Sequence, residues 1–138
     1  MAISEDASKS VPITDRERYD AGMRIRRQVL GDAYVDGTLA NRNDFNTEFQ
    51  EMVTRHAWGT IWTRPGLEMK TRSCIVMAMT IALGAWDELR LHVRGGLNNG
   101  LTRDEIKEVI LQATVYCGAP AGVHAMRVTQ EVLAEMVG

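Results

Sequence analysis

Apolar residues recur along most of the chain with the three- to four-residue spacing of amphipathic helices. No segment alternates for long with a period of two, and there is no repeat of about 20–50 residues. The pattern predicts an all-α fold of about six helices in a single domain over residues 14–138. Residues 1–13 are small, polar and without period, which predicts a flexible N-terminal arm.

Two capping boxes mark predicted helix starts. Thr14-x-x-Glu17 predicts a helix from about Asp15 to Leu30, and Thr102-x-x-Glu105 predicts a later helix that ends near Gly118. In this motif the hydroxyl and the carboxylate each accept a hydrogen bond from an amide of the first turn that has no helical partner. A last helix is predicted from about Ala121 to Val137.

The region after the first helix is harder to interpret. Residues 32–40 predict a connector with a short turn of helix, and Asn43 predicts the N-cap of a second helix. Several apolar residues and one histidine share a face of this second helix, so we interpret His56 as a hydrogen-bonded core histidine. That face consists of Phe45, Phe49, Met52, Val53 and His56.

Two more helices are predicted in the middle of the chain. Residues 67–83 are apolar nearly all round, which predicts a central, buried helix. Residues 86–97 predict the next helix, and Asn99-Gly100 predicts a left-handed stop after it. Helices this apolar are compatible with a homo-oligomer in which some faces meet other subunits.

Composition narrows the class of protein. The chain has 138 residues, 45% of them hydrophobic and 25% charged, with a net charge of −2, as in ordinary globular proteins. Such a balance does not favour nucleic acid as the main partner. Two cysteines cannot form a disulfide framework, and no signal peptide or run of about 20 apolar residues is present. We therefore expect a reduced cytoplasmic protein that has no membrane or nucleic-acid partner.

Histidines are scarce, and His92 is the strongest candidate for proton transfer. Glu88 precedes it by four residues, so the two side chains share one helix face. A carboxylate at this spacing can hold the imidazole in one tautomer near neutral pH, although the two residues can equally form a surface pair. His124, close to Cys117 in sequence, can be structural, a proton carrier, or without a role.

The remaining candidates are two arginines and a cysteine. Arg64 and Arg72 bracket Pro65 and can pair with acidic neighbours or bind a ligand carboxylate as forks. Cys117 lies where one helix ends and another begins, which favours either a reactive thiolate or, if it is buried, an inert side chain. No His-x-x-x-His or Cys-x-x-Cys spacing and no phosphate or dinucleotide motif occurs, so neither a metal nor a cofactor is expected.

Three segments carry a resemblance to a known family. RRQVLGDAYVD (Arg26–Asp36), FQEMVTRHAWGTIWTRPGL (Phe49–Leu67) and ELRLHVRGGLNNGLTRDEIKEVILQATVYCGAP (Glu88–Pro120) resemble the carboxymuconolactone decarboxylase family, over about residues 19–132. The resemblance implies an all-α fold like that of alkylhydroperoxidase D. It also implies a cofactor-independent decarboxylation of 4-carboxymuconolactone, a small lactone dicarboxylate, to the β-ketoadipate enol-lactone in protocatechuate catabolism. A homohexamer built as a trimer of dimers is implied as well.

The chemistry of that reaction suggests roles for the candidates. His92 would be the proton donor and Glu88 would orient it, because no other histidine has a carboxylate at helical spacing. Arg72 and Arg64 would anchor the retained carboxylate. The other side chains expected to line the substrate pocket are Trp58, Trp62, Tyr116 and Cys117.

Two alternative functions remain open. In the wider family a reactive motif of glutamate, two cysteines and a histidine supports peroxidase chemistry, and Glu105, Cys117 and His124 fall at matching positions. The place of the second cysteine is taken by Pro120, so a dithiol–disulfide cycle cannot close within the chain. The alternatives are therefore a thiol-dependent, peroxidase-like enzyme of this fold and a non-catalytic helical oligomer.

Overall fold

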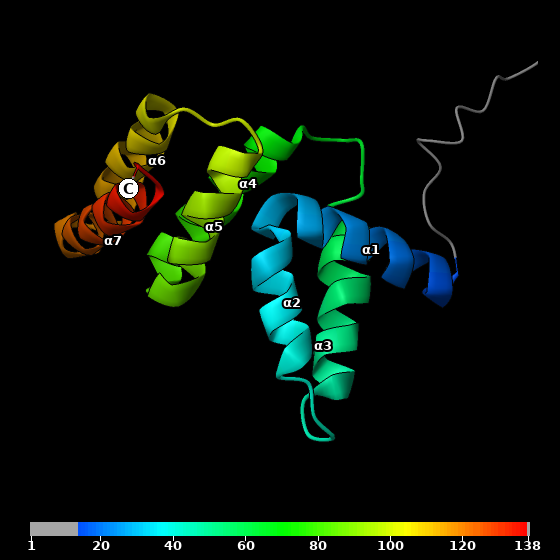
Figure 1. Ribbon diagram of the computed structural model, residues 1–138. Helices are drawn as coiled ribbons and strands as arrows, with labels where there is room; N and C mark the ends of the chain where they lie inside the picture. Colours follow the sequence, from blue (N-terminus) through cyan, green and yellow to red (C-terminus); the bar gives the residue numbers. More distant parts are fainter. Residues whose placement is uncertain (1–13, 138) are drawn as a thin grey trace, which may run out of the picture. The chain divides into compact units, whose positions relative to one another are not determined.

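A computed structural model describes residues 14–137, and all regular structure in that range is helical (Figure 1). The all-α prediction is confirmed, and the described residues form seven α-helices and one π-helical segment where about six helices were expected. The predicted arm, residues 1–13, lies outside the described residues. The elements are α1 (Asp15–Leu30), α2 (Asp32–Ala40), α3 (Thr47–Val53), the π-helix η2 (Thr54–Ile61), α4 (Met69–Leu83), α5 (Trp86–Asn98), α6 (Arg103–Cys117) and α7 (Ala119–Val137).

The described residues divide into two compact units, and the boundary in the sequence lies between Glu68 and Met69. The N-terminal unit (residues 14–68) contains α1, α2, α3 and η2, and the C-terminal unit (residues 69–137) contains α4 to α7.

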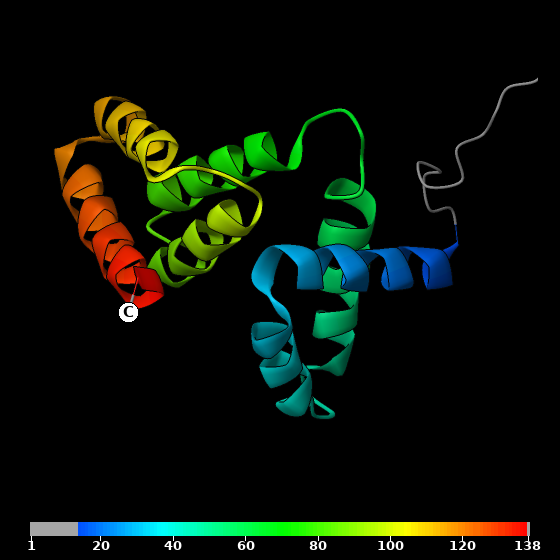
Figure 2. The same ribbon diagram turned by 45° about the horizontal axis from the view of Figure 1, so that its top comes forward.

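The N-terminal unit is organised around a close helix crossing. The capping box at its start is present as predicted, with Glu17 N–H donating to Thr14 Oγ1 at 3.1 Å. From there α1 crosses the continuous rod formed by α3 and η2 (Figure 2). Gly22 and Gly59 lie at the crossing, and a Cβ atom at Gly59 would come within 2.1 Å of the Arg18 carbonyl oxygen. Glycine is therefore needed because two backbones touch.

Two expectations for this unit were wrong. Residues 32–40 form a full helix, α2, because Gly31 (φ 88°) turns the chain sharply and a new helix starts directly after it. Asn43 does not cap α3. Its side-chain oxygen accepts hydrogen bonds from the amides of Phe45 (2.9 Å) and Asn46 (3.0 Å), which makes a turn, and the helix begins only at Thr47.

The predicted apolar face of the second helix is not the buried one. Phe45 is 94% exposed and Phe49 63% exposed, and His56 is also exposed, so it is not a core histidine. The buried residues of η2 are Thr54, Trp58 and Gly59, because α1 covers that side. Periodicity identified an apolar face correctly but could not tell which face another helix would cover.

The C-terminal unit is a four-helix arrangement in which α4 packs beside α5 and α6 beside α7 (Figure 2). Lys70 pairs with Glu105 at 3.4 Å, and Asn99 Nδ2 donates to Ser73 Oγ at 2.9 Å, which ties α4 to α6 and to the end of α5. Gly100 (φ 95°) ends α5 in a left-handed conformation, as predicted. The core consists of Met77, Ile81, Leu89, Val93, Leu101, Ile106, Ile110, Ala113, Ala125, Val128 and Val132.

The central helix α4 is less buried than its sequence predicts. It starts at Met69, and only its face with Ser73, Met77, Thr80 and Ile81 is buried. The other face carries three exposed apolar side chains at i, i+4 and i+8, namely Ile75 (38%), Met79 (58%) and Leu83 (81%). No helix in the described part of the chain is long and apolar enough to cross a membrane.

The crossing of α1 and η2 gives a direct test of the packing. Gly59→Ala should destabilise the protein by about 2 kcal/mol or more, because the added methyl group meets the backbone of Arg18 and neither helix can move without separating. Urea unfolding followed by circular dichroism measures the change.

The matched control is Gly37→Ala in α2, where an added Cβ meets nothing within 4 Å. This variant should be neutral or stabilised by up to about 1 kcal/mol. Equal stability of the two variants would contradict the close crossing.

Candidate functional site

His92 lies on the buried side of α5, at helical spacing from Leu89, Val93 and Gly96. It is 9% exposed, so the helix period that buries the apolar residues buries the imidazole as well. Burial disfavours the charged ring and lowers the pKa of His92 to about 4, against the opposing effect of the Glu88 carboxylate. At neutral pH the imidazole is therefore uncharged.

Glu88 lies one turn before His92 on α5, and its side chain is exposed. The negative charge of Glu88 favours the protonated form of His92 and so opposes the effect of burial on the pKa of the ring. The two residues are close enough for their charges to interact, as the i, i+4 spacing predicts. The pair combines a buried imidazole with a water-accessible carboxylate, an arrangement suited to bringing a proton in from solvent.

His124 lies in a different environment. Its ring stacks on Trp86, with centroids 4.0 Å apart and planes 15° from parallel. Arg127 Nη2 lies 2.9 Å from His124 Nε2. A guanidinium has no acceptor, so it donates and His124 carries its proton on Nδ1. This contact and the stacking on Trp86 hold the His124 ring in place near the start of α7.

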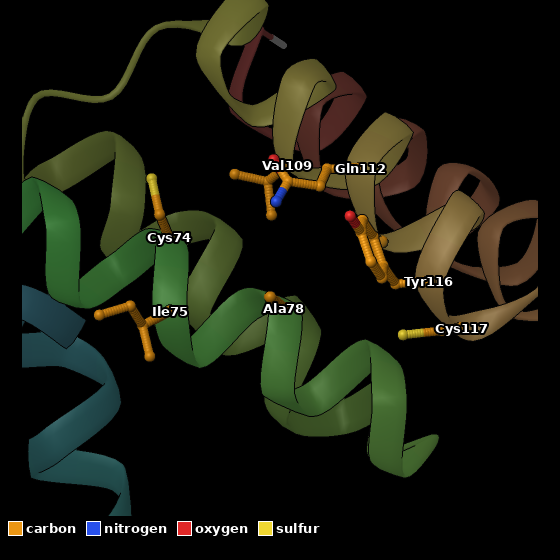
Figure 3. A pocket seen from close by; sticks show the side chains of 8 residues that line it. Cys74, Ile75, Ala78, Val109, Gln112, Tyr116 and Cys117 are labelled. Carbon is orange, nitrogen blue, oxygen red and sulfur yellow. The ribbon is translucent and has the colours of Figure 1, made fainter.

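Tyr116 and Cys117 line a pocket of about 300 Å³ between α4 and α6 (Figure 3). Cys74, Ile75 and Ala78 from α4 form one wall, and Cys74 lies at the opposite end from Cys117. The rest of the lining comes from Val109, Gln112 and Ala113. No charged residue lines this pocket, so it is poorly suited to hold a dianion. Neither His92 nor Arg72 lines it.

The two cysteines differ in exposure. Cys117 is the last residue of α6 and is exposed, so the alternative in which burial in the core makes it inert is wrong. Gly118 (φ 100°) ends α6 at this point, and α7 begins at Ala119. Cys74 is partly buried, and desolvation, with a smaller contribution from Glu105, raises the pKa of its thiol. Cys117 is the more accessible thiol of the two.

The other predicted residues are placed within each unit. Trp58 and Trp62 are buried in the N-terminal unit and stack on each other with centroids 5.0 Å apart. Arg64 follows them in an exposed turn. Arg72 lies in the C-terminal unit as a half-buried residue of α4. Their joint role at one site stays a prediction.

Sequence reasoning missed Cys74 and Gln112 as pocket residues. The two cysteines are 43 positions apart on different helices, and no local spacing connects them. Only the packing of α4 on α6 brings their surroundings together. Within residues 14–137, no three His, Cys, Asp or Glu side chains form a group that could hold a metal ion.

Comparison with known proteins identifies relatives of the chain. The profile of the carboxymuconolactone decarboxylase family matches residues 47–131. The chain is 46% identical over 124 residues to 4-carboxymuconolactone decarboxylase of Acinetobacter baylyi, which covers 90% of this chain and 92% of that protein. It is 47% identical over 122 residues to nitrosuccinic acid decarboxylase of Metarhizium robertsii, covering 88% and 85%. A 4-carboxymuconolactone decarboxylase of Pseudomonas putida is 67% identical over 45 residues, 33% of this chain and 94% of that one.

The buried His92 predicts a loss of stability in acid. Its pKa is about 4 in the folded protein and about 6.5 when unfolded, so the unfolded state binds the proton more tightly. This difference in pKa stabilises the folded protein fully above pH 6.5. The stabilisation is lost as the pH falls from 6.5 to 4, and the loss is about 3 kcal/mol at most. Urea unfolding at several pH values measures it.

The substitution His92→Gln should flatten this part of the stability profile. The exposed His56 provides the control, because His56→Gln should leave the profile of the parent protein unchanged. A parent profile that is already flat between pH 6.5 and 4 would contradict the buried neutral imidazole.

Proposed function

The chain belongs to the carboxymuconolactone decarboxylase family and is a carboxy-lyase, and we propose that its substrate is 4-carboxymuconolactone. The product would be the β-ketoadipate enol-lactone with release of CO₂, a step of protocatechuate breakdown. The observation that carries this proposal is the 46% identity to a 4-carboxymuconolactone decarboxylase over nine-tenths of both chains.

Nitrosuccinic acid is a second candidate substrate. It is suggested by a relative of this chain, a nitrosuccinic acid decarboxylase with 47% sequence identity. In both compounds one carbon carries the departing carboxylate, a CH₂COO⁻ arm and an electron-withdrawing group. Loss of CO₂ leaves a carbanion that this group stabilises, as a dienolate in the lactone and as a nitronate in the nitro acid. We therefore propose that the site recognises a succinate-like core and that the surrounding side chains select the acceptor group.

The proposed reaction needs no organic electron sink. The bond between the ring carbon and the carboxylate breaks, and its electron pair moves through the ring double bond to the lactone carbonyl oxygen. Donors directed at that oxygen would stabilise the developing charge, an effect of several kcal/mol in such sites. The α carbon then takes a proton, so one proton is consumed in each turnover.

His92 is the proposed source of that proton. In the free protein its imidazole is neutral at pH 7, because burial lowers its pKa to about 4. A substrate with two negative charges close to the ring favours the imidazolium, as any nearby anion does. The proton would therefore enter together with the substrate, with Glu88 supporting the charged ring from the solvent side.

The remaining roles are proposed as follows. Arg72 and Arg64 would bind the retained carboxylate through their planar guanidinium groups. Trp58 and Trp62, already stacked on each other, would keep water away from the departing carboxylate. Tyr116 and Cys117 stay predicted as pocket residues with no covalent role for the thiol, although the pocket that they line includes neither His92 nor Arg72.

The protein is further proposed to act as a homo-oligomer, a homohexamer built as a trimer of dimers. Exposed apolar side chains on the C-terminal unit support this, since a monomer seldom leaves such a set in water. They are Ile75, Met79, Leu83, Leu111, Val115, Tyr116 and Val123. Light scattering that returned the mass of a monomer at micromolar concentration would contradict it.

The function is tested by mixing purified protein with 4-carboxymuconolactone and following ultraviolet absorbance, since conjugation changes on decarboxylation. The parent protein should turn the lactone over, and His92→Asn should lower kcat by about 10²- to 10⁴-fold, the usual contribution of general acid–base catalysis. A loss of less than about threefold would rule out His92 as the proton donor.

Two controls separate the alternatives. Cys117→Ser should retain activity, whereas a thiol-dependent enzyme would lose it and would turn over a hydroperoxide with a dithiol. Nitrosuccinic acid in the same assay, with CO₂ release as readout, shows which acceptor group is preferred. Turnover of neither compound would overturn the proposed substrate class.

A further inference from the structure

Arg26 is an unusual residue of the N-terminal unit, because it is 6% exposed and no carboxylate pairs with it among the described residues. Both of its hydrogen-bond acceptors among the described residues are neutral. Nη1 donates to Thr54 Oγ1 at 3.3 Å, and Nη2 donates to Gln50 Oε1 at 3.5 Å. Both contacts are long for a guanidinium, whose hydrogen bonds to a carboxylate are usually about 2.7–2.9 Å.

The neighbouring arginine shows the contrast. Arg27 lies next to Arg26 on α1 and pairs with two carboxylates, Asp32 at 3.0 Å and Asp36 at 2.9 Å. Arg27 is also the more exposed of the two. The buried guanidinium is thus the one without a negative partner, although an uncompensated charge is most costly where water is excluded.

Burial is the main influence on the pKa of the Arg26 guanidinium. Desolvation lowers the pKa of Arg26, and the nearby cations Arg42 and Arg27 lower it further, while Tyr34 and Tyr19 act in the opposite direction. Glu51 does not relieve the imbalance, because its carboxylate lies 4.0 Å from Arg42 and 3.6 Å from Arg55. Arg26 therefore carries a buried positive charge that no carboxylate among the described residues compensates.

One edge of the Arg26 guanidinium has an N–H group without an acceptor among the described residues. Its Nε–H is buried and donates to no described atom, and the adjacent Nη2 makes only the 3.5 Å contact with Gln50. Nε and Nη2 together form the side-on fork that binds the two oxygens of a carboxylate. The Tyr19 hydroxyl oxygen accepts from Arg42 Nη2 at 3.4 Å, which leaves its own hydrogen for another acceptor.

We propose that Arg26 is the centre of a carboxylate-binding site in the N-terminal unit, with Tyr19 and Arg42 as further donors. A carboxylate fits this donor set better than a phosphate, because the edge formed by Nε and Nη2 offers two parallel N–H groups in one plane. The carboxylate can come from the substrate of the decarboxylase or from a separate small acid. The inference concerns binding alone and does not depend on the proposed function.

The direct test uses the folded parent protein and succinate as the probe. The Nε–H signal of Arg26 in a ¹H–¹⁵N spectrum, assigned by its absence in Arg26→Lys, should move downfield as succinate is added, with sodium chloride at equal ionic strength as the reference. The melting temperature should rise by about 4 °C at ten times the dissociation constant of succinate. An unmoved Nε–H signal would overturn the proposal.

Two variants on α1 complete the test. Arg26→Met should abolish the succinate-dependent rise in melting temperature and, without succinate, should be as stable as the parent protein or more so, because an unpaired buried charge is replaced by an apolar chain of similar length. Arg24→Met removes an exposed arginine of the same helix and should keep the full rise. An equal rise in all three proteins would show nonspecific anion binding and contradict the site.

The source of the carboxylate is distinguished by kinetics. Competitive inhibition of decarboxylation by succinate, lost in Arg26→Met, assigns the site to the substrate. Binding of succinate without inhibition assigns it to a separate acid. Both outcomes require that Arg26 binds the carboxylate.

Discussion

The desolvation of ionisable side chains is the constraint on which the chemistry of this protein depends. His92 occupies a position on α5 that the helix period would otherwise give to an apolar residue, and burial there lowers its pKa to about 4. A decarboxylase must protonate the carbanion left by CO₂, and a neutral imidazole cannot do so. With His92 as the proposed proton donor, uptake of the proton would be coupled to the arrival of the negative charge that the proposed substrate carries.

The same constraint acts on Arg26 in the other unit. It falls on the buried face of α1 between Gly22 and Val29, and within residues 14–137 its hydrogen bonds go to neutral oxygens. A protein that keeps a charged group in such a place must provide a compensating charge or bind one. Buried ionisable groups of this kind cluster at functional positions, and both units of the chain contain one.

The rest of the packing leaves much apolar surface in water. In the C-terminal unit α4 buries Met77 and Ile81 but exposes Met79 and Leu83, and α6 exposes Val115 at 80%. The pocket between these two helices has no charged lining. Binding a dianionic substrate therefore requires charged groups that do not line this pocket. The uncharged surface around the pocket is suited to contact with another protein chain.

The sequence by itself determined where most helices begin and end, because those signals are local. Thr14 and Thr102 form their capping boxes, Gly100 takes the left-handed stop, and the helical spacing of Glu88 and His92 holds. Similarity of the quoted segments also indicated the family. The tertiary structure alone decided which faces are covered, since that depends on helices distant in the sequence. It exposed Phe45 and His56, placed Cys74 and Cys117 on one pocket, and buried Arg26 on the covered face of α1.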